Sequence, residues 1–173
     1  YACNGILFNH ESPRRGENFV TRKITQTVAQ IAAGKAECLH IGNLNARRDW
    51  GYAPEYVRAM WLMLQQERAD DFVIATGELH SVRELIQQAF AYAGIRIEWE
   101  GTAAAERGID AASGKTRVQV DPKYYRPIDI ESVLGDASKA RRELGWVPEV
   151  KFDKLVEIMM EADMKAARTA RRD

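Results

Sequence analysis

Length, composition and charge describe an ordinary globular domain. The chain has 173 residues, of which 46% are hydrophobic and 29% are charged, enough apolar material to bury a substantial core. Its 25 Lys and Arg residues balance 25 Asp and Glu residues, so the chain lacks the basic field on which non-specific nucleic-acid binding depends. No nucleic acid is expected as a partner, and any recognition of phosphate must be local.

Membrane and metal classes are also disfavoured. No apolar run approaches the ~18 residues that span a bilayer, and the first residues lack the charged region of a signal peptide, so no membrane association is expected. Cys3 and Cys38 show no metal-ligand spacing, and a cysteine-poor chain is typical of a reducing compartment. The histidines His10, His40 and His80 lie far apart in sequence. We therefore expect a cytoplasmic protein without a metal site.

The chain opens on an apolar stretch, residues 2–8, with the length and content of a buried strand. A strand buried on both faces needs neighbours, and in a parallel sheet these come from preceding βα units. We therefore expect an upstream segment, and an exposed apolar edge when the 173 residues stand alone. Residues 9–18 follow as a long polar loop.

Helices alternate with short strands along the rest of the chain. One helix, at residues 55–66, begins behind Pro54, and its apolar side chains fall on one stripe that we expect to be packed. That stripe consists of Val57, Met60, Trp61 and Leu64. Other helices are expected at residues 21–33 and 152–168, and strands at 37–41, 71–76, 95–100 and 116–120.

Local signals mark several boundaries. Ser81 and Glu84, three residues apart, form the sequence of a capping box at a helix start. Residues 101–115 are rich in Gly, Ala and polar residues, which predicts a loop or mobile flap. A short helix is expected from residues 136–139 to a stop at Gly145.

The strongest functional signal is a set of arginines in loops beside turn-forming residues. A guanidinium offers a planar fork of donors that matches two phosphate oxygens at once, so loop arginines that converge on one cleft suit a diphosphate. Surface salt bridges, for example between Arg48 and Asp49, remain an open alternative. The arginines are Arg14, Arg15, Arg47, Arg48 and Arg126.

Polar side chains suited to a sugar or ribose occur in the same segments, although each could equally be a turn or cap residue. His10 directly follows a predicted strand, where open α/β sheets place ligands, so we favour a binding role for it. Structural roles are expected for His40 and His80. The polar candidates are Asn9, Asn18, Lys23, Tyr52 and Asp129.

The motifs that the sequence lacks limit its chemistry. It contains no GxGxxG loop that opens a βαβ unit and no GxSxG nucleophile motif. These residues therefore cannot hold a dinucleotide by the usual contact of phosphate with a helix N-terminus. The 173 residues are not expected to form a self-sufficient oxidoreductase.

Three blocks of sequence carry a resemblance to a known family. They are LFNHESPRRG at residues 7–16, NFVTRKI at 18–24 and GNLNARRDWGY at 42–52. Together they resemble GDP-mannose 4,6-dehydratase, of the extended short-chain dehydrogenase/reductase superfamily. Shorter matches extend the resemblance over nearly the whole chain, at residues 75–78, 125–127, 134–136 and 144–146.

The resemblance implies an α/β fold, the carboxy-terminal part of an extended short-chain dehydrogenase/reductase. Residues 1–173 would form one unit, the last strands of a Rossmann sheet plus a smaller substrate-binding domain. NADP would be the cofactor and GDP-mannose the substrate, which loses water to give GDP-4-dehydro-6-deoxy-mannose. The family's catalytic Tyr-xxx-Lys pair, with its Thr and Glu helpers, would lie before Tyr1, so the resemblance assigns no catalytic residue here.

What the resemblance does imply for this chain is binding. It places His10 and Arg15 near NADP. At Asp129 the family usually has Glu, and the shorter Asp side chain puts the expected hydroxyl contact in question. For the substrate it implies Asn9, Val20, Lys23, Arg48, Arg126 and Asp129.

Two other functions remain open. A sister epimerase, reductase or dehydratase of the same superfamily would use another nucleotide sugar. A non-catalytic GDP-sugar-binding module would bind without turnover. For the enzyme, the resemblance implies a homo-oligomer, either a dimer or a tetramer.

Overall fold

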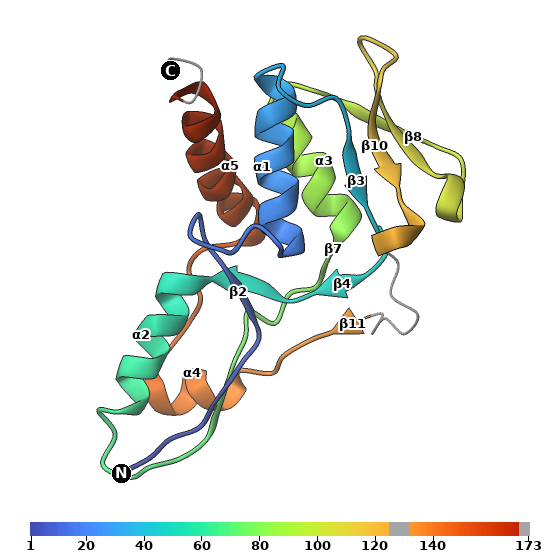
Figure 1. Cartoon of the computed structure of the whole chain (residues 1–173). Coiled ribbons are helices and arrows are strands. Elements are labelled where there is room, and N and C mark those ends of the chain that lie inside the picture. The colour runs from blue at the N-terminus through green and yellow to red at the C-terminus, as the bar shows by residue number, and fades with distance from the viewer. Residues whose placement is uncertain (125–131, 170–173) are drawn as a thin grey trace.

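A computed structural model describes residues 1–124 and 132–169. Within these residues the buried apolar side chains form two separate clusters, a larger core and a smaller core. The larger core lies at the top of Figure 1 and the smaller core near the N-terminus at the bottom. In the same residues, no helix is both long enough and apolar enough to cross a bilayer.

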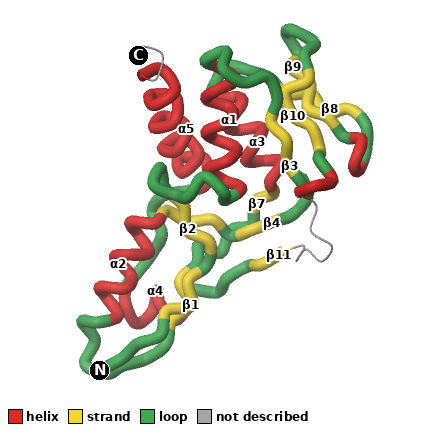
Figure 2. Tube along the Cα trace, in the orientation of Figure 1, coloured by secondary structure: helices red, strands yellow, loops and turns green. Residues whose placement is uncertain are grey.

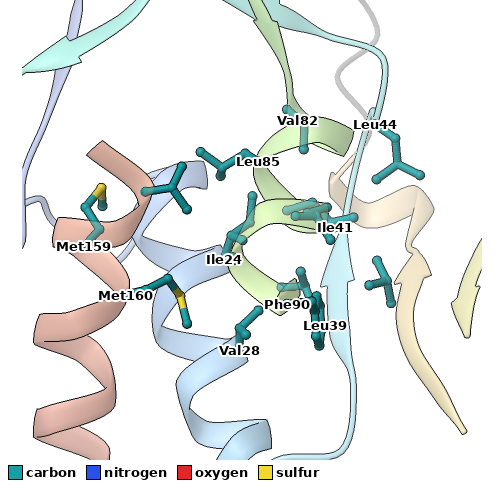
Figure 3. Packing of buried hydrophobic residues seen from close by; sticks show 14 of the residues in the cluster. Ile24, Val28, Leu39, Ile41, Leu44, Val82, Leu85, Phe90, Met159 and Met160 are labelled. Atoms are coloured by element: carbon teal, nitrogen blue, oxygen red, sulfur yellow. The ribbon is translucent and has the colours of Figure 1, made fainter. Parts of the chain in front are cut away.

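The larger core lies between three helices and a sheet. Figure 1 shows α1 (Val20–Ala32), α3 (Val82–Tyr92) and α5 (Phe152–Thr169) side by side. Figure 3 shows how their apolar faces meet: Ile24, Phe90 and Met160 are fully buried, and each such side chain contributes about 1.5–3 kcal/mol. The sheet has the order β3 (Leu39–Ile41), β10 (Thr116–Val120), β9 (Arg107–Asp110) and β8 (Ile97–Glu100), with β3 parallel to β10 and the other pairs antiparallel.

A buried polar cluster joins α1 to α5 within this layer. Asp163 of α5 is 3% exposed, and its carboxylate accepts a hydrogen bond of 2.7 Å from the Thr25 hydroxyl. Arg22 pairs with the same carboxylate at 2.8 Å. Burial raises the pKa of Asp163, and the Thr25 bond and the Arg22 charge oppose that shift. The pair fixes the axial position of α1, whose first turn forms part of the site described below.

The smaller core is built on two parallel strands, β1 (Gly5–Leu7) and β6 (Phe72–Ile74). The helices α2 (Ala53–Met63) and α4 (Ser138–Leu144) pack on one face of this pair. Among the described residues only one face of β1 is covered, because Leu7 packs into the core while Ile6 is 56% exposed. The expectation that preceding βα units cover the other face stays a prediction.

The apolar stripe predicted to pack α2 is also mostly solvent-exposed. Trp61 is 59% exposed, whereas Tyr56, Ala59 and Met63 form the buried face. The prediction that this stripe is packed is therefore wrong for the described residues: the stripe is apolar, but the neighbouring face of α2 packs against the smaller core. Among the described residues this stripe is largely uncovered at Val57, Met60, Trp61 and Leu64.

Short strands connect the two cores. β2 (Asn9–Glu11) pairs in parallel with β5 (Trp50–Tyr52). β4 (Arg47–Arg48) lies between β11 (Ser132–Val133) and β7 (His80–Ser81). Figure 2 shows these strands between the two groups of helices.

The local boundary signals have mixed outcomes. The capping box is confirmed, since Ser81 accepts from the Glu84 amide and Glu84 accepts from the Ser81 amide. Gly145 ends α4 in a left-handed conformation, as expected. The loop prediction for residues 101–115 is wrong in part, because β9 and the short helix η1 (Ala103–Ala105) lie within it. The loop prediction for residues 9–18 is wrong at its start, where β2 forms.

Candidate functional site

A cavity of about 530 Å³ lies where β2, the N-terminus of α1 and the loop after β3 meet. Its volume falls in the range of small-molecule sites. Five of the residues predicted to bind ligand line it: Asn9, Arg15, Val20, Lys23 and Arg48. Arg126 and Asp129 fall outside the described residues. The remaining lining residues are Glu11, Asn18, Phe19, Ile41, Gly42, Asn43, Ala46, Trp50, Val82 and Tyr124.

The alternation of β2 separates two groups of predicted ligands. Asn9 and Glu11 line the cavity, whereas His10, between them, is not among the lining residues. Side chains of successive strand residues point to opposite faces, so His10 lies on the far side of the strand. There its ring stacks on Tyr56 of α2, with centroids 5.0 Å apart.

The N-terminus of α1 presents backbone donors at the cavity. Phe19 is the N-cap residue and makes no side-chain capping bond, and the first turn contains no acidic residue. The first hydrogen bond of the helix runs from the Lys23 amide to the Phe19 carbonyl. The backbone amides of residues 20–22 therefore have no acceptor within the helix. The positive end of the helix dipole therefore faces a cavity that also contains cationic side chains.

Two of these cations stand over aromatic rings at the rim of the cavity. The Arg15 guanidinium carbon is 3.5 Å from the centre of the Phe19 ring, and the Lys23 ammonium is 3.3 Å from that of Tyr124. Both rings are about half exposed. An aromatic ring attracts a cation to its face, which restrains these long side chains at the mouth of the cavity.

Tyr124 reaches the cavity because residue 42 is glycine. A Cβ atom at Gly42 would lie 2.4 Å from the Tyr124 carbonyl oxygen, far inside van der Waals contact. Tyr124 ends the short helix η2 (Pro122–Tyr124), which therefore packs directly on the backbone after β3. Any larger residue at position 42 would push Tyr124 away from Lys23.

A buried carboxylate lies behind Arg15. Glu11 is 2% exposed, accepts a 2.6 Å hydrogen bond from the Thr21 hydroxyl and lies 3.2 Å from Nε of Arg15. Desolvation raises the pKa of Glu11, and the Thr21 bond and the Arg15 and His10 charges oppose that shift. Glu11 therefore forms an ion pair with the guanidinium from the buried side.

A second buried carboxylate, Asp49, lies next to Arg48 in sequence. Its side chain is fully buried and turned inward: it accepts from the Thr76 amide at 2.9 Å, the Thr76 hydroxyl at 2.6 Å and the Gly77 amide at 2.8 Å. A longer bond of 3.4 Å comes from the Gly135 amide. Asp49 therefore ties the strand that carries Arg48 to the segments after β6 and β11.

The remaining candidates divide between the cavity and other places. Asn18 lines the cavity, whereas Tyr52 packs against the larger core and does not line it. Neither Arg14 nor Arg47 is among the lining residues. Sequence reasoning missed Glu11 and Asp49 because nothing in a single sequence distinguishes these buried acids from surface acids.

The other histidines lie away from the cavity. His80 stacks on Phe152 with ring centroids 3.8 Å apart, in agreement with the structural role expected for it, and His40 is exposed on β3. Within residues 1–124 and 132–169 no three His, Cys, Asp or Glu side chains gather as metal ligands would.

The fold matches solved enzymes of the extended short-chain dehydrogenase/reductase class. A structure of RMD from Pseudomonas aeruginosa complexed with NADPH has a TM-score of 0.75 and 18% identity, over 94% of this chain and 48% of that chain. UDP-glucose 4-epimerase from Thermotoga maritima, solved with UDP-glucose, has a TM-score of 0.70 and 23% identity, over 94% of this chain and 45% of that chain.

The family model of GDP-mannose 4,6 dehydratase matches residues 1–159, and the chain belongs to that family. It is 55% identical to GDP-mannose 4,6 dehydratase of Drosophila melanogaster, over 97% of this chain and 42% of the relative. For the Homo sapiens relative the identity is 55%, over 98% of this chain and 45% of the relative. For the relative from Sinorhizobium fredii the identity is 54%, over 99% of this chain and 49% of the relative. The chain thus spans less than half the length of these relatives.

Proposed function

We propose that the protein carrying this chain is a GDP-mannose 4,6-dehydratase. It would convert GDP-mannose to GDP-4-dehydro-6-deoxy-mannose and water by an NADP-dependent internal redox reaction. This chain would supply the GDP-sugar side of the cleft. The observation that carries the proposal is the single cavity shared by Asn9, Arg15, Val20, Lys23 and Arg48 in a chain of this family.

The chemistry of the cavity supports a nucleoside diphosphate. Arg48 and Lys23 add positive charge near the first backbone amides of α1, which have no acceptor within the helix. Cationic side chains and the amides of a helix N-terminus both bind phosphate oxygens. Asn9 offers a carboxamide, which donates to and accepts from sugar hydroxyls. We extend the proposal to Arg126 and Asp129 as further substrate contacts on the strength of the family resemblance alone.

NADP is the proposed cofactor. Arg15 fits it because its guanidinium, held from behind by Glu11, still has two terminal nitrogens for a phosphate or ribose oxygen. His10 fits it from the opposite face of β2. When bound, NADP supplies the hydride acceptor and donor of the cycle, and these residues would orient it.

The same proposal covers the organisation of the protein. β1, β6, α2 and α4 would be the end of a Rossmann sheet with its helices, and the larger core would be the substrate-binding domain. The uncovered apolar stripe on α2 and the exposed Ile6 are consistent with this arrangement. We also propose a homo-oligomer, dimer or tetramer, and a cytoplasmic location, the latter in keeping with the free cysteines Cys3 and Cys38.

The first test uses the protein as its own gene encodes it. GDP-mannose and NADP are incubated with it, and mass spectrometry follows the loss of one water from the sugar nucleotide. Conversion supports the proposal. Conversion of only another nucleotide sugar in competition would indicate a sister enzyme, and tight GDP-mannose binding without conversion would indicate a binding module.

A matched pair of variants tests the site itself. Arg48 lines the cavity, whereas the adjacent Arg47 is exposed and does not. Arg48→Ala removes a charge-assisted contact, so the KM for GDP-mannose should rise about 10- to 100-fold. Arg47→Ala should leave it near the wild-type value. Equal effects of the two variants would contradict the proposed position of the diphosphate.

A further inference from the structure

Arg15 lies on a tight turn between β2 and α1. The Arg15 amide donates to the Ser12 carbonyl at 2.9 Å, which closes residues 12–15 into a β-turn. Within the turn, the Arg14 amide donates to the Ser12 hydroxyl oxygen at 3.1 Å, and Pro13 occupies the second position, which favours proline. The place of this turn therefore sets where the Arg15 side chain starts on its way to the cavity.

Arg22, in the first turn of α1, bridges the β-turn to the C-terminal helix α5. One of its terminal nitrogens, Nη1, donates to the Pro13 carbonyl. The other, Nη2, lies 2.8 Å from the Asp163 carboxylate. The Arg22 side chain is 17% exposed and the Asp163 side chain 2%, so water and salt weaken the ion pair little.

The α5 end of this bridge is anchored from a second direction. Thr25, one turn further along α1, donates from its hydroxyl to the same carboxylate at 2.7 Å. The other hydrogen bonds of Thr25 among the described residues go to backbone carbonyls of α1 itself. Asp163 thus accepts from two side chains of α1, and of these two Arg22 is the one that also contacts the β-turn.

The contacts of the Arg15 side chain act on its guanidinium and leave the backbone of the turn to Arg22. Glu11 pairs with Nε, and the Phe19 ring lies under the guanidinium carbon. Among the described residues, Arg22 makes the one side-chain hydrogen bond from outside residues 12–15 to their backbone. Loss of that bond should let the turn shift, and Arg15 would move with it.

We propose that Arg22 is a positioning residue of the cofactor site: anchored by Asp163, it holds the Pro13 carbonyl and so places Arg15 against the bound NADP. The proposal rests on the proposed function, because it takes Arg15 as a ligand of NADP. Arg22 is not among the residues that line the cavity, so it acts through Arg15. The C-terminal helix would thereby contribute to cofactor affinity from within the larger core (Figure 1).

Three variants separate the bridge from charge and from packing. Arg22→Lys keeps the charge that faces Asp163, but one ammonium replaces the planar fork that reaches two acceptors, so NADPH binding should weaken about 3- to 10-fold. Asp163→Asn removes the charge that anchors Arg22 and should weaken binding in the same direction. Thr25→Val removes the other bond to Asp163 and keeps the bridge, so it should lower the urea midpoint but change the NADPH affinity by less than about twofold.

A double-mutant cycle with Arg15 distinguishes positioning from a general loss of stability. Calorimetry measures NADPH affinity for the protein as its gene encodes it and for Arg22→Lys, Arg15→Ala and the double variant. If Arg22 acts through Arg15, adding Arg22→Lys to Arg15→Ala should change the affinity by less than about twofold. Additive effects, an unchanged affinity in Arg22→Lys, or an equal loss in Thr25→Val overturns the inference while the proposed function stands.

The remaining outcomes of the experiment are also decisive. If Arg22→Lys does not fold, as judged by circular dichroism, Asp163→Asn takes its place in the same cycle with Arg15→Ala, and additive effects there overturn the inference. An Arg15→Ala protein that binds NADPH as tightly as wild type overturns both the role of Arg15 and the inference built on it. A wild-type protein that binds no NADPH overturns the proposed cofactor itself.

Discussion

Removing the inward-facing carboxylate of Asp49 should strongly destabilise the fold. Asp49→Ala leaves the amides of Thr76, Gly77 and Gly135 without their acceptor. An unsatisfied buried donor costs about 1–3 kcal/mol. The 3.4 Å bond from Gly135 is long, and Gly77 is exposed enough for water to replace its partner in part. We therefore expect the three lost hydrogen bonds together to lower the free energy of unfolding by about 3 kcal/mol, the low end of their summed cost.

A loss of that size is easily measured. Domains are typically stable by about 5–15 kcal/mol, and urea slopes are about 1–3 kcal/mol per molar, so the unfolding midpoint should fall by about 1–3 M. Asp49→Asn keeps one acceptor oxygen but turns an NH₂ group towards the donors, so its midpoint should fall between wild type and Asp49→Ala. Circular dichroism during urea titration gives all three values.

The matched control for Asp49 is Asp153, an exposed acid in the first turn of α5. Its described hydrogen bond is a single one, from Gln88 at 2.7 Å. Asp153→Asn should therefore change the stability by no more than about 0.5 kcal/mol. If Asp49→Ala stayed within that same margin, the carboxylate would not be holding the three segments together.

Three further predictions follow from buried and exposed groups. Burial raises the pKa of Glu11 above the value of about 4.3 at which the unfolded side chain titrates. Between these two pKa values the native state binds more protons than the unfolded state, so the free energy of unfolding falls as pH rises. Glu11→Gln should therefore be at least as stable as wild type at pH 7 and flatten this part of the urea-midpoint profile; a less stable variant at pH 7 would contradict the sign. On α2, Ala59→Glu places a charge in the smaller core and should cost several kcal/mol, whereas Trp61→Glu on the exposed face should leave the urea midpoint of the 173-residue chain nearly unchanged. Ser81→Ala removes a capping bond and should lower thermal stability by about 1 kcal/mol, and no change would mean that the cap does not form in solution.

Local chemistry was readable from the sequence, and the partners of each surface were not. Ser81 and Glu84 are three residues apart, and the capping box depends only on that spacing. The stripe on α2 is different, because periodicity identifies an apolar face without identifying what covers it. Met63 was absent from the predicted stripe but packs in the smaller core, whereas Trp61 was in the stripe and is exposed.

The site shows the same division. Loop arginines and Asn9 were found from residue type, and the cavity brings Arg15 and Arg48 together. The side of the strand on which His10 lies could not be predicted, because residues 9–18 were expected to form a loop and a loop has no alternation. Pairing of β2 with β5 sets that side, and pairing over such a sequence distance depends on the whole fold.

This pairing makes β2 the link between the two proposed ligands. Asn9 faces the cavity and His10 faces Tyr56, so consecutive residues of one strand contact the two sides. The strand is held on the cavity side by the Glu11–Thr21 bond to α1, in the larger core, and on the other side by the His10–Tyr56 stack, in the smaller core. Any shift of one core against the other must therefore move Asn9 and His10 together. The geometry at the sugar and the geometry at the cofactor are set by the same three-residue strand, and the correct placement of each requires both cores to be folded and docked.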